Sequence, residues 1–173
     1  MAAFLGLHPS APVYFTGHSL GAALATISVA RFQGVNCALY TFGSPRVGDD
    51  RFVRAVLQKT PKVFRFINCQ DIVTQIPPEV ALKNYYRHVG EERYINRTGA
   101  ILDHPSEFDK WVDATAGVVA HDGTSAISEI SHPAKFISLA AERGALPDPP
   151  PFLIGNHTPA RYAIRIWNQY SGL

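Results

Sequence analysis

The chain has 173 residues, of which 46% are hydrophobic and 17% charged, so it has the length of one domain and enough apolar residues for a core. Its 16 Lys and Arg residues against 14 Asp and Glu leave a net charge of +2, which makes no electrostatic case for a nucleic-acid partner. Two cysteines exclude a disulfide-stapled miniprotein and a four-cysteine zinc site, and no apolar run approaches the ~20 residues that span a bilayer.

The first seventy residues alternate between predicted strands and predicted helices. β-Branched and aromatic residues predict a strand over residues 13–16, and apolar residues at helical spacing predict a helix over 19–32. A strand over 35–42, a helix over 49–59 and a strand over 63–68 follow, separated by Gly and Pro. Strands that alternate with helices and are joined by short links run parallel, so the predicted fold class is α/β.

The second half of the chain has a less regular pattern. There we predict a strand over 85–89, a hairpin of 93–96 and 100–102, helices over 105–115, 133–142 and 160–169, and a stiff proline-rich loop over 147–151. The two cysteines lie at opposite ends of neighbouring predicted strands, about 20 Å apart at ~3.3 Å per residue. That separation is too great for a disulfide, so we expect two thiols, with Cys37 in the core and Cys69 beyond the third strand.

Ligands of parallel sheets bind beyond the carboxyl ends of the strands, which here are the loops around Ser19, Ser44 and Asp71. The first of these loops carries a G-x-S-x-G motif over residues 17–21, between a predicted strand and a predicted helix. This is the pattern of a nucleophile elbow, with glycines at 17 and 21 where crowded side chains would clash and Ser19 exposed as the nucleophile. The amide of Leu20, at the start of the helix, is the candidate oxyanion donor.

A serine nucleophile needs a base and a carboxylate that orients the base. Asp71 follows the third predicted strand and is the candidate acid. Asp49 and Asp50 are predicted to start a helix, and the acids of the second half follow no predicted strand: Asp103, Asp109, Asp113 and Asp122.

Seven histidines compete for the role of the base. His157 comes last, and Ser19, Asp71 and His157 then follow the chain order of α/β-hydrolases. His18 adjoins the nucleophile and is expected to pack under the turn, because adjacent residues there point apart. The other histidines precede prolines or lie in a predicted strand or a polar loop: His8, His88, His104, His121 and His132. No His-x₃-His or Cys-x₂-Cys pair occurs, so we expect no metal site.

Four segments give the chain a specific resemblance to a known family. They are residues 13–25 with the elbow, residues 40–48 (YTFGSPRVG), residues 65–73 followed by Pro77 and Pro78, and residues 156–158 with Tyr162 behind them. Together they resemble the class 3 lipases, a family of α/β-hydrolases that includes fungal triacylglycerol lipases. Ala22 lies where that family commonly has glycine, and the stretch between residues 71 and 157 matches weakly.

The resemblance implies an α/β-hydrolase fold, a mostly parallel sheet flanked by helices, in a single partial domain over residues 1–173. It implies a Ser19–Asp71–His157 triad, a structural role for Ser44, no cofactor, and hydrolysis of a lipid or small ester through an acyl-enzyme. Transient contact with a lipid surface is a further expectation, whereas a nucleic-acid partner is not expected.

In that family the nucleophile follows the fifth strand, whereas only about a dozen residues precede it here. We therefore expect the N-terminal strands, the lid and the second oxyanion donor to be absent, leaving a bare sheet edge that favours self-association. A weakly active or non-catalytic truncated protein, and a thioesterase or acyltransferase with the same triad, stay open as alternatives. The chain starts without the basic region of a secretory signal, which predicts a cytoplasmic protein as it stands.

Overall fold

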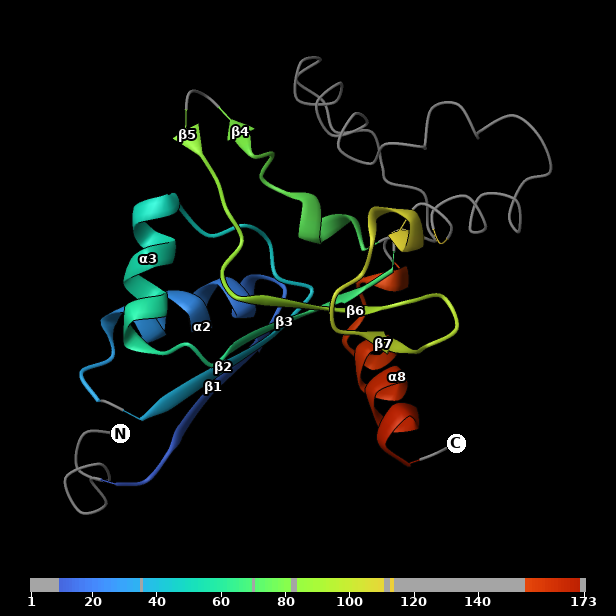
Figure 1. Ribbon diagram of the computed structural model, residues 1–173, viewed down its shortest axis with the longest axis horizontal. Helices are drawn as coiled ribbons and strands as arrows, with labels where there is room; N and C mark the ends of the chain where they lie inside the picture. The colour runs from blue at the N-terminus through green and yellow to red at the C-terminus, as the bar shows by residue number, and fades with distance from the viewer. Residues whose placement is uncertain are drawn as a thin grey trace.

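A computed structural model describes residues 10–34, 36–69, 71–81, 84–110, 113 and 155–171. These residues form a five-stranded sheet, a separate two-stranded sheet and the helices that pack on them (Figure 1). The elements in chain order are β1 (Val13–His18), α2 (Leu20–Arg31), β2 (Cys37–Phe42), α3 (Asp50–Lys59), β3 (Val63–Asn68), η1 (Ile72–Gln75), β4 (Val80–Ala81), β5 (Asn84–Tyr85), β6 (Glu91–Ile95), β7 (Ile101–Leu102) and α8 (Pro159–Ser171).

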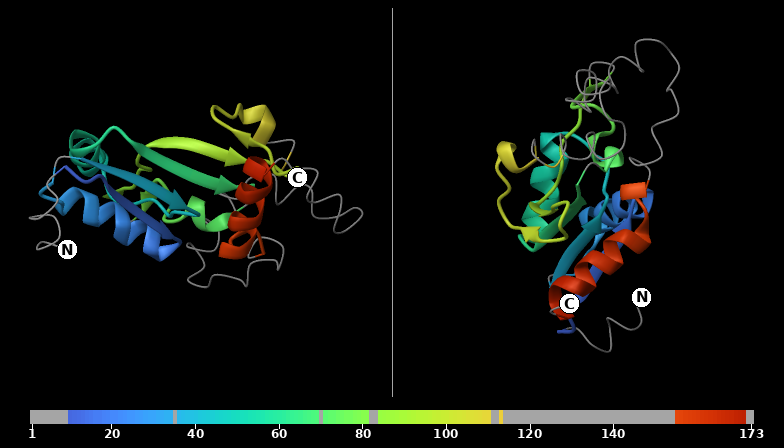
Figure 2. Two further views of the ribbon diagram at one scale, coloured as in Figure 1. Left: turned by 90° about the horizontal axis from the view of Figure 1, so that it is seen from below. Right: turned by 90° about the vertical axis from the view of Figure 1, so that its right-hand side faces the viewer.

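The main sheet has the strand order β1-β2-β3-β6-β7, and its first four strands are parallel. Only β7 runs antiparallel, because it forms a hairpin with β6. The parallel strands point their carboxyl ends toward α8 (Figure 2). The predicted α/β class with a mostly parallel sheet is therefore confirmed, and β1 and β7 are the two edge strands among the described residues.

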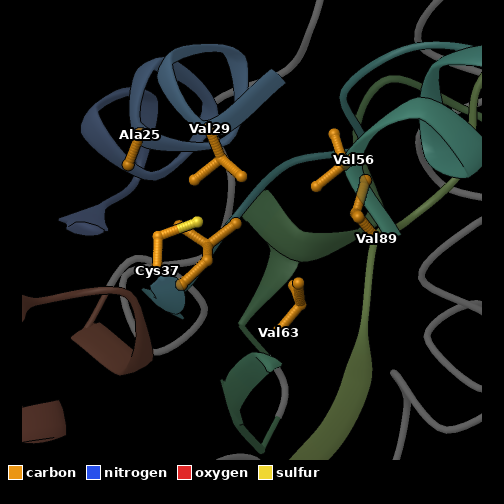
Figure 3. Packing of buried hydrophobic residues seen from close by; sticks show 7 residues of the cluster. Ala25, Val29, Cys37, Val56, Val63 and Val89 are labelled. Carbon is orange, nitrogen blue, oxygen red and sulfur yellow. The ribbon is translucent and has the colours of Figure 1, made fainter. Parts of the chain in front are cut away.

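One face of the sheet is covered by α2 and α3. The main apolar core lies between these two helices and the sheet. In it, Ala25 and Val29 of α2 face Val56 of α3, Cys37 of β2 and Val63 of β3 (Figure 3). Alternate residues of a strand point to opposite faces, which gives β2 and β3 an aliphatic side toward the helices. This packing fixes the start of α2, and with it the turn that carries Ser19.

The opposite face carries aromatic side chains, which pack toward α8. Phe42 of β2 stacks on Phe66 of β3 with ring centroids 5.1 Å apart, and the buried Tyr162 of α8 completes this cluster. The helix α8 lies across the carboxyl ends of the strands (Figure 2). It brings the last part of the chain into contact with Ser19 and Asp71.

Most predicted elements occur in the structure, including the first five, the hairpin and the final helix. The predicted strand over 85–89 is wrong, since only Tyr85 lies in a strand. The reason is that the backbone of the next residues bonds to loops instead of a strand: Arg87 N donates to Gly48 O and Tyr86 N to Glu79 O, each at 2.8 Å. Residues 107–110 and 113 are helical, within the predicted helix over 105–115, while the predictions over 133–142 and 147–151 lie outside the described residues.

Both cysteines are free and buried, as predicted, with Cys37 in the main core and Cys69 beside Ile67 and Tyr94. Burial raises the pKa of both thiols. Among the residues that the structure describes, none of the helices has the length and apolar character needed to cross a membrane.

His88 is a buried histidine whose titration should control acid stability. Its Nε2 lies 2.8 Å from Thr74 O, and burial, followed by the charges of Arg65 and Arg46, lowers its pKa from 6.5 to about 3. Below pH 6.5, His88 therefore binds a proton in the unfolded chain but stays neutral in the folded chain. The free energy of unfolding consequently decreases as the pH falls below 6.5. We expect a loss of about 2–3 kcal/mol between pH 6.5 and pH 4.5 from this group.

The measurement is urea unfolding at the two pH values for the unchanged chain and for His88→Gln, whose amide can still donate to Thr74 O. The variant should lose less stability on acidification by about that amount. His104→Gln, at an exposed position, is the matched control. An equal acid loss in all three proteins would contradict the prediction.

Candidate active site

The turn between β1 and α2 holds Ser19 in a strained conformation, with φ 56° and ψ −128°. A non-glycine residue at positive φ costs free energy that the surrounding packing must supply. Gly17 is required here, since a Cβ at that position would collide with the backbone carbonyl of Gly21. The expected second clash is not present: a Cβ at Gly21 would meet none of the described atoms within 4 Å.

One hydrogen-bonded line joins Ser19, His157 and Asp71, which come from distant parts of the chain. Ser19 lies in the turn between β1 and α2, His157 lies on the loop before α8, and Asp71 follows β3. His157 Nε2 lies 2.8 Å from Ser19 Oγ, and His157 Nδ1 lies 2.9 Å from both carboxylate oxygens of Asp71. With Nδ1 donating its proton to Asp71, the lone pair of Nε2 is free to accept the proton of Ser19. The side chain of Asp71 is fully buried, whereas that of His157 is 16% exposed.

Asp71 is held in place by two further donors. Its Oδ1 accepts from Val73 N at 3.0 Å, and its Oδ2 accepts from the hydroxyl of Tyr162 at 2.6 Å. The same hydroxyl accepts from Asn68 N at 2.8 Å. Burial, and then the charge of Asp71, raises the pKa of Tyr162, which keeps the phenol protonated and able to donate.

Arg165 of α8 ties the same helix to the end of β3. Its Nη1 donates to Asn68 Oδ1 at 2.6 Å and to Asn96 O at 2.7 Å, while Asn68 Nδ2 donates to Asn156 O at 2.7 Å. These bonds fix the loop that carries His157 relative to Asp71. No local motif in the sequence indicated Arg165 or Asn68, because each acts through a partner far away in the chain.

His18 does not simply pack under the turn, as the sequence had led us to expect. Its Nε2 lies 2.6 Å from the carbonyl oxygen of His157, and the two rings are 4.5 Å apart between centroids at 38°. The His18 ring also meets the ring of Tyr162 edge-on at 5.7 Å. His18 therefore contacts the candidate base, a role that its position next to Ser19 did not reveal.

The loop after β2 approaches the same centre. Gly43 has φ +57°, and a Cβ there would lie 2.8 Å from Asp71 Oδ2 and 3.0 Å from His157 Nδ1. Gly43 belongs to the YTFGSPRVG segment of the sequence, which by itself did not indicate this close approach to Asp71 and His157. Ser44 is buried and donates to Pro45 O at 2.9 Å, in keeping with its expected structural role.

Two features border Ser19. Leu20 N is the first amide of α2, one of the four N–H groups that a helix leaves without internal partners, so it can face a developing oxyanion. An apolar pocket of about 360 Å³ lies between α8 and the ends of β1 and β2, where His18 and Phe42 contribute to its lining. Its lining consists of His18, Phe42, Pro159, Tyr162, Ala163, Ile166, Trp167 and Tyr170. Ser19 is not part of this lining.

The other candidate histidines and acids that the structure describes, apart from His18, do not contact Ser19. Asp49 caps α3 by accepting from Phe52 N at 2.9 Å, and Asp50 lies in the first turn of that helix, as predicted. The remaining described candidates contact other groups or solvent: His88, His104, Asp103, Asp109 and Asp113. His8, His121, His132 and Asp122 lie outside the described residues. In the described part of the chain, no cluster of three His, Cys, Asp or Glu side chains could hold a metal ion.

A mostly parallel sheet with a serine on a strained strand-to-helix turn, and an aspartate and a histidine beside it at the carboxyl ends of the strands, is the architecture of the α/β-hydrolases. Residues 1–81 match the family described as "Lipase (class 3)". The chain is therefore class 3 lipase-like in its family match, its relatives and its fold.

Among its relatives is the secreted mono- and diacylglycerol lipase 1 of Fusarium solani, 36% identical over 135 residues, which are 77% of this chain and 40% of that protein. The lipase of Rhizomucor miehei is 39% identical over 95 residues, covering 51% of this chain and 25% of that protein. A solved triacylglycerol lipase, whose catalytic centre is described as a serine protease triad, superimposes with a TM-score of 0.50 at 32% identity, covering 58% of this chain and 39% of its own.

The chain thus spans well under half the length of these relatives. The expected cytoplasmic location stays a prediction, and the Fusarium relative is described as secreted.

Proposed function

We propose that the protein is a serine hydrolase of carboxylic esters of lipids, with Ser19 as nucleophile, His157 as base and Asp71 as the acid that orients the base. The observation that carries this proposal is the hydrogen-bonded line from Ser19 Oγ through His157 to Asp71, at 2.8 Å and 2.9 Å. The relatives described as mono- and diacylglycerol lipase and as lipase support a lipid ester as the substrate class.

The proposed reaction has two halves. His157 Nε2 takes the proton of Ser19 as its oxygen attacks the ester carbonyl carbon, and the oxyanion that forms faces the amide of Leu20. The tetrahedral intermediate collapses to an acyl-enzyme, and the leaving alcohol takes the proton from His157. Water then attacks the acyl group with His157 again as base, which releases the carboxylic acid and restores Ser19. Asp71 holds the Nδ1–H tautomer and stabilises the charged imidazole in both halves.

Two further proposals concern the surface around Ser19. Three apolar side chains recur along the exposed side of α2 next to the nucleophile, with Leu20 70%, Leu24 57% and Ile27 39% exposed. This stripe supports transient contact with a lipid surface. Among the described residues, no strand pairs with the outer side of β1, which supports self-association by strand pairing.

A fluorophosphonate probe tests the proposed nucleophile without any knowledge of the substrate. We expect the probe to label the folded chain at Ser19, as located by peptide mass spectrometry. Labelling should be lost in Ser19→Ala and kept in Ser44→Ala, the matched serine on the neighbouring loop. An intact, folded chain that is not labelled at Ser19 would overturn the proposed function.

The substrate class needs a separate comparison. We expect hydrolysis of p-nitrophenyl esters to persist from acetyl to palmitoyl chains and to exceed hydrolysis of the matching thioesters. A sharp loss beyond short chains would exclude lipid esters as the preferred substrates. A clear preference for thioesters would favour the thioesterase alternative.

A further inference from the structure

His18 is a second histidine within the candidate site, and the proposed reaction does not use it. Its ring lies 4.5 Å from the ring of His157, and its Nε2 is 2.6 Å from the carbonyl oxygen of that residue. A carbonyl oxygen only accepts hydrogen bonds, so His18 Nε2 must carry a proton and donate it. His18 thus holds the backbone of the residue that provides the base.

The charge of His18 matters because of what happens to its neighbour during the reaction. His157 becomes positively charged each time it takes a proton from Ser19 or from water. A neutral His18 donates its hydrogen bond without opposing that charge. A protonated His18 would place a second positive charge against the same ring, which disfavours the charged form of His157.

Among the described residues, three titratable groups face His18. Asp71 attracts a positive charge on His18, His157 opposes it, and Tyr162 of α8 presents the edge of a neutral phenol ring at 5.7 Å. Burial is the largest influence and lowers the pKa of His18 below its ordinary value of 6.5. His18 is therefore mostly neutral at pH 7, and it gains its positive charge at a lower pH than an unperturbed histidine does.

We propose that His18 is a positioning residue that holds His157 by a hydrogen bond to its carbonyl oxygen and must stay neutral for His157 to act as a base. This inference rests on the proposed function, since it assigns His157 as the base. It adds the protonation of His18 to the acid side of the activity profile.

The experiment measures the second-order rate of fluorophosphonate labelling of Ser19 from pH 5 to pH 8. Two variants separate the contributions of His18. His18→Gln keeps an amide donor for the carbonyl of His157 but cannot take a positive charge. His18→Phe keeps an aromatic ring against His157 but has no donor and no charge. His104→Gln, an exposed histidine in the described part of the chain, is the matched control, and thermal unfolding checks that each variant is folded.

We expect the labelling rate of His18→Gln, divided by that of the unchanged protein, to be constant above pH 6.5. Below that pH the ratio should rise by about tenfold, because only the unchanged protein gains the opposing charge. His18→Phe should show the same rise, together with a lower rate at pH 8 because the carbonyl of His157 has lost its donor. His104→Gln should give a ratio of one throughout.

A ratio that stays flat for both His18 variants, with Ser19 still labelled, would overturn the role of His18 charge and leave the proposed function standing. A His18→Phe rate at pH 8 equal to that of His18→Gln would overturn the role of the hydrogen bond. Failure of Ser19 to react in the unchanged protein would overturn the proposed function itself.

Discussion

Replacement of Asp71 by asparagine is expected to lower kcat for ester hydrolysis by about 10⁴-fold, the magnitude measured for this change in another triad. Both carboxylate oxygens of Asp71 lie 2.9 Å from His157 Nδ1, and Oδ2 also accepts from Tyr162. An amide has only one acceptor oxygen, so its NH₂ group must face one of the two donors that hold Asp71, the amide of Val73 or the hydroxyl of Tyr162. In either position it also lies within reach of His157 Nδ1, where it favours the wrong tautomer, and the loss of the carboxylate removes the charge that stabilises protonated His157.

The measurement is kcat and KM on one p-nitrophenyl ester, together with the fluorophosphonate labelling rate of Ser19. The matched control is Asp103→Asn, because the side chain of Asp103 is 69% exposed and pairs with Arg93 of β6. The control should keep full activity. An Asp71→Asn variant with kcat within tenfold of the unchanged protein would contradict the assignment of Asp71 as the triad acid.

Replacement of Gly43 by alanine should lower kcat/KM by about 10²-fold, because misplacement of reacting groups by about 1 Å can cost this much. The new Cβ would come within 2.8 Å of Asp71 Oδ2, closer than real Cβ atoms pack, and within 3.0 Å of His157 Nδ1, which is tighter than most such contacts. Asp71 is anchored by Val73 and Tyr162, so the movement should fall mainly on the imidazole. Gly43 also has φ +57°, which adds a backbone strain of about 1–2 kcal/mol for an L-residue.

Gly99→Ala separates these two effects. Gly99 also has a positive φ, at +96°, but none of the described atoms lies within 4 Å of a Cβ added there. Both variants should lose stability in urea unfolding through backbone strain, and Gly43→Ala should lose more because of its added contact, whereas only Gly43→Ala should lose activity. Equal activity of the two variants would show that the contact with Asp71 and His157 does not control the site.

The sequence by itself determined the features that depend on short stretches of chain. The strand, turn and helix around Ser19 follow from adjacent residues. A side chain at position 17 would clash with the backbone of Gly21, which lies only four residues further along the chain. The parallel order of the first strands follows from the short links between them and the alternation of strands and helices. Asp71 could be selected as the candidate acid because it directly follows one of those strands.

The tertiary structure decided what depends on contacts between distant segments. The apposition of His157 to Ser19, 138 residues away, requires α8 to dock across the strand ends, and that docking depends on Tyr162 and Arg165. The contact of His18 with His157, and the closeness of Gly43 to Asp71, arise only when three loops converge at one edge of the sheet. Local steric clashes and hydrophobic periodicity depend on neighbouring residues and can be read from the sequence. A hydrogen bond between remote side chains exists only after packing has brought their elements together.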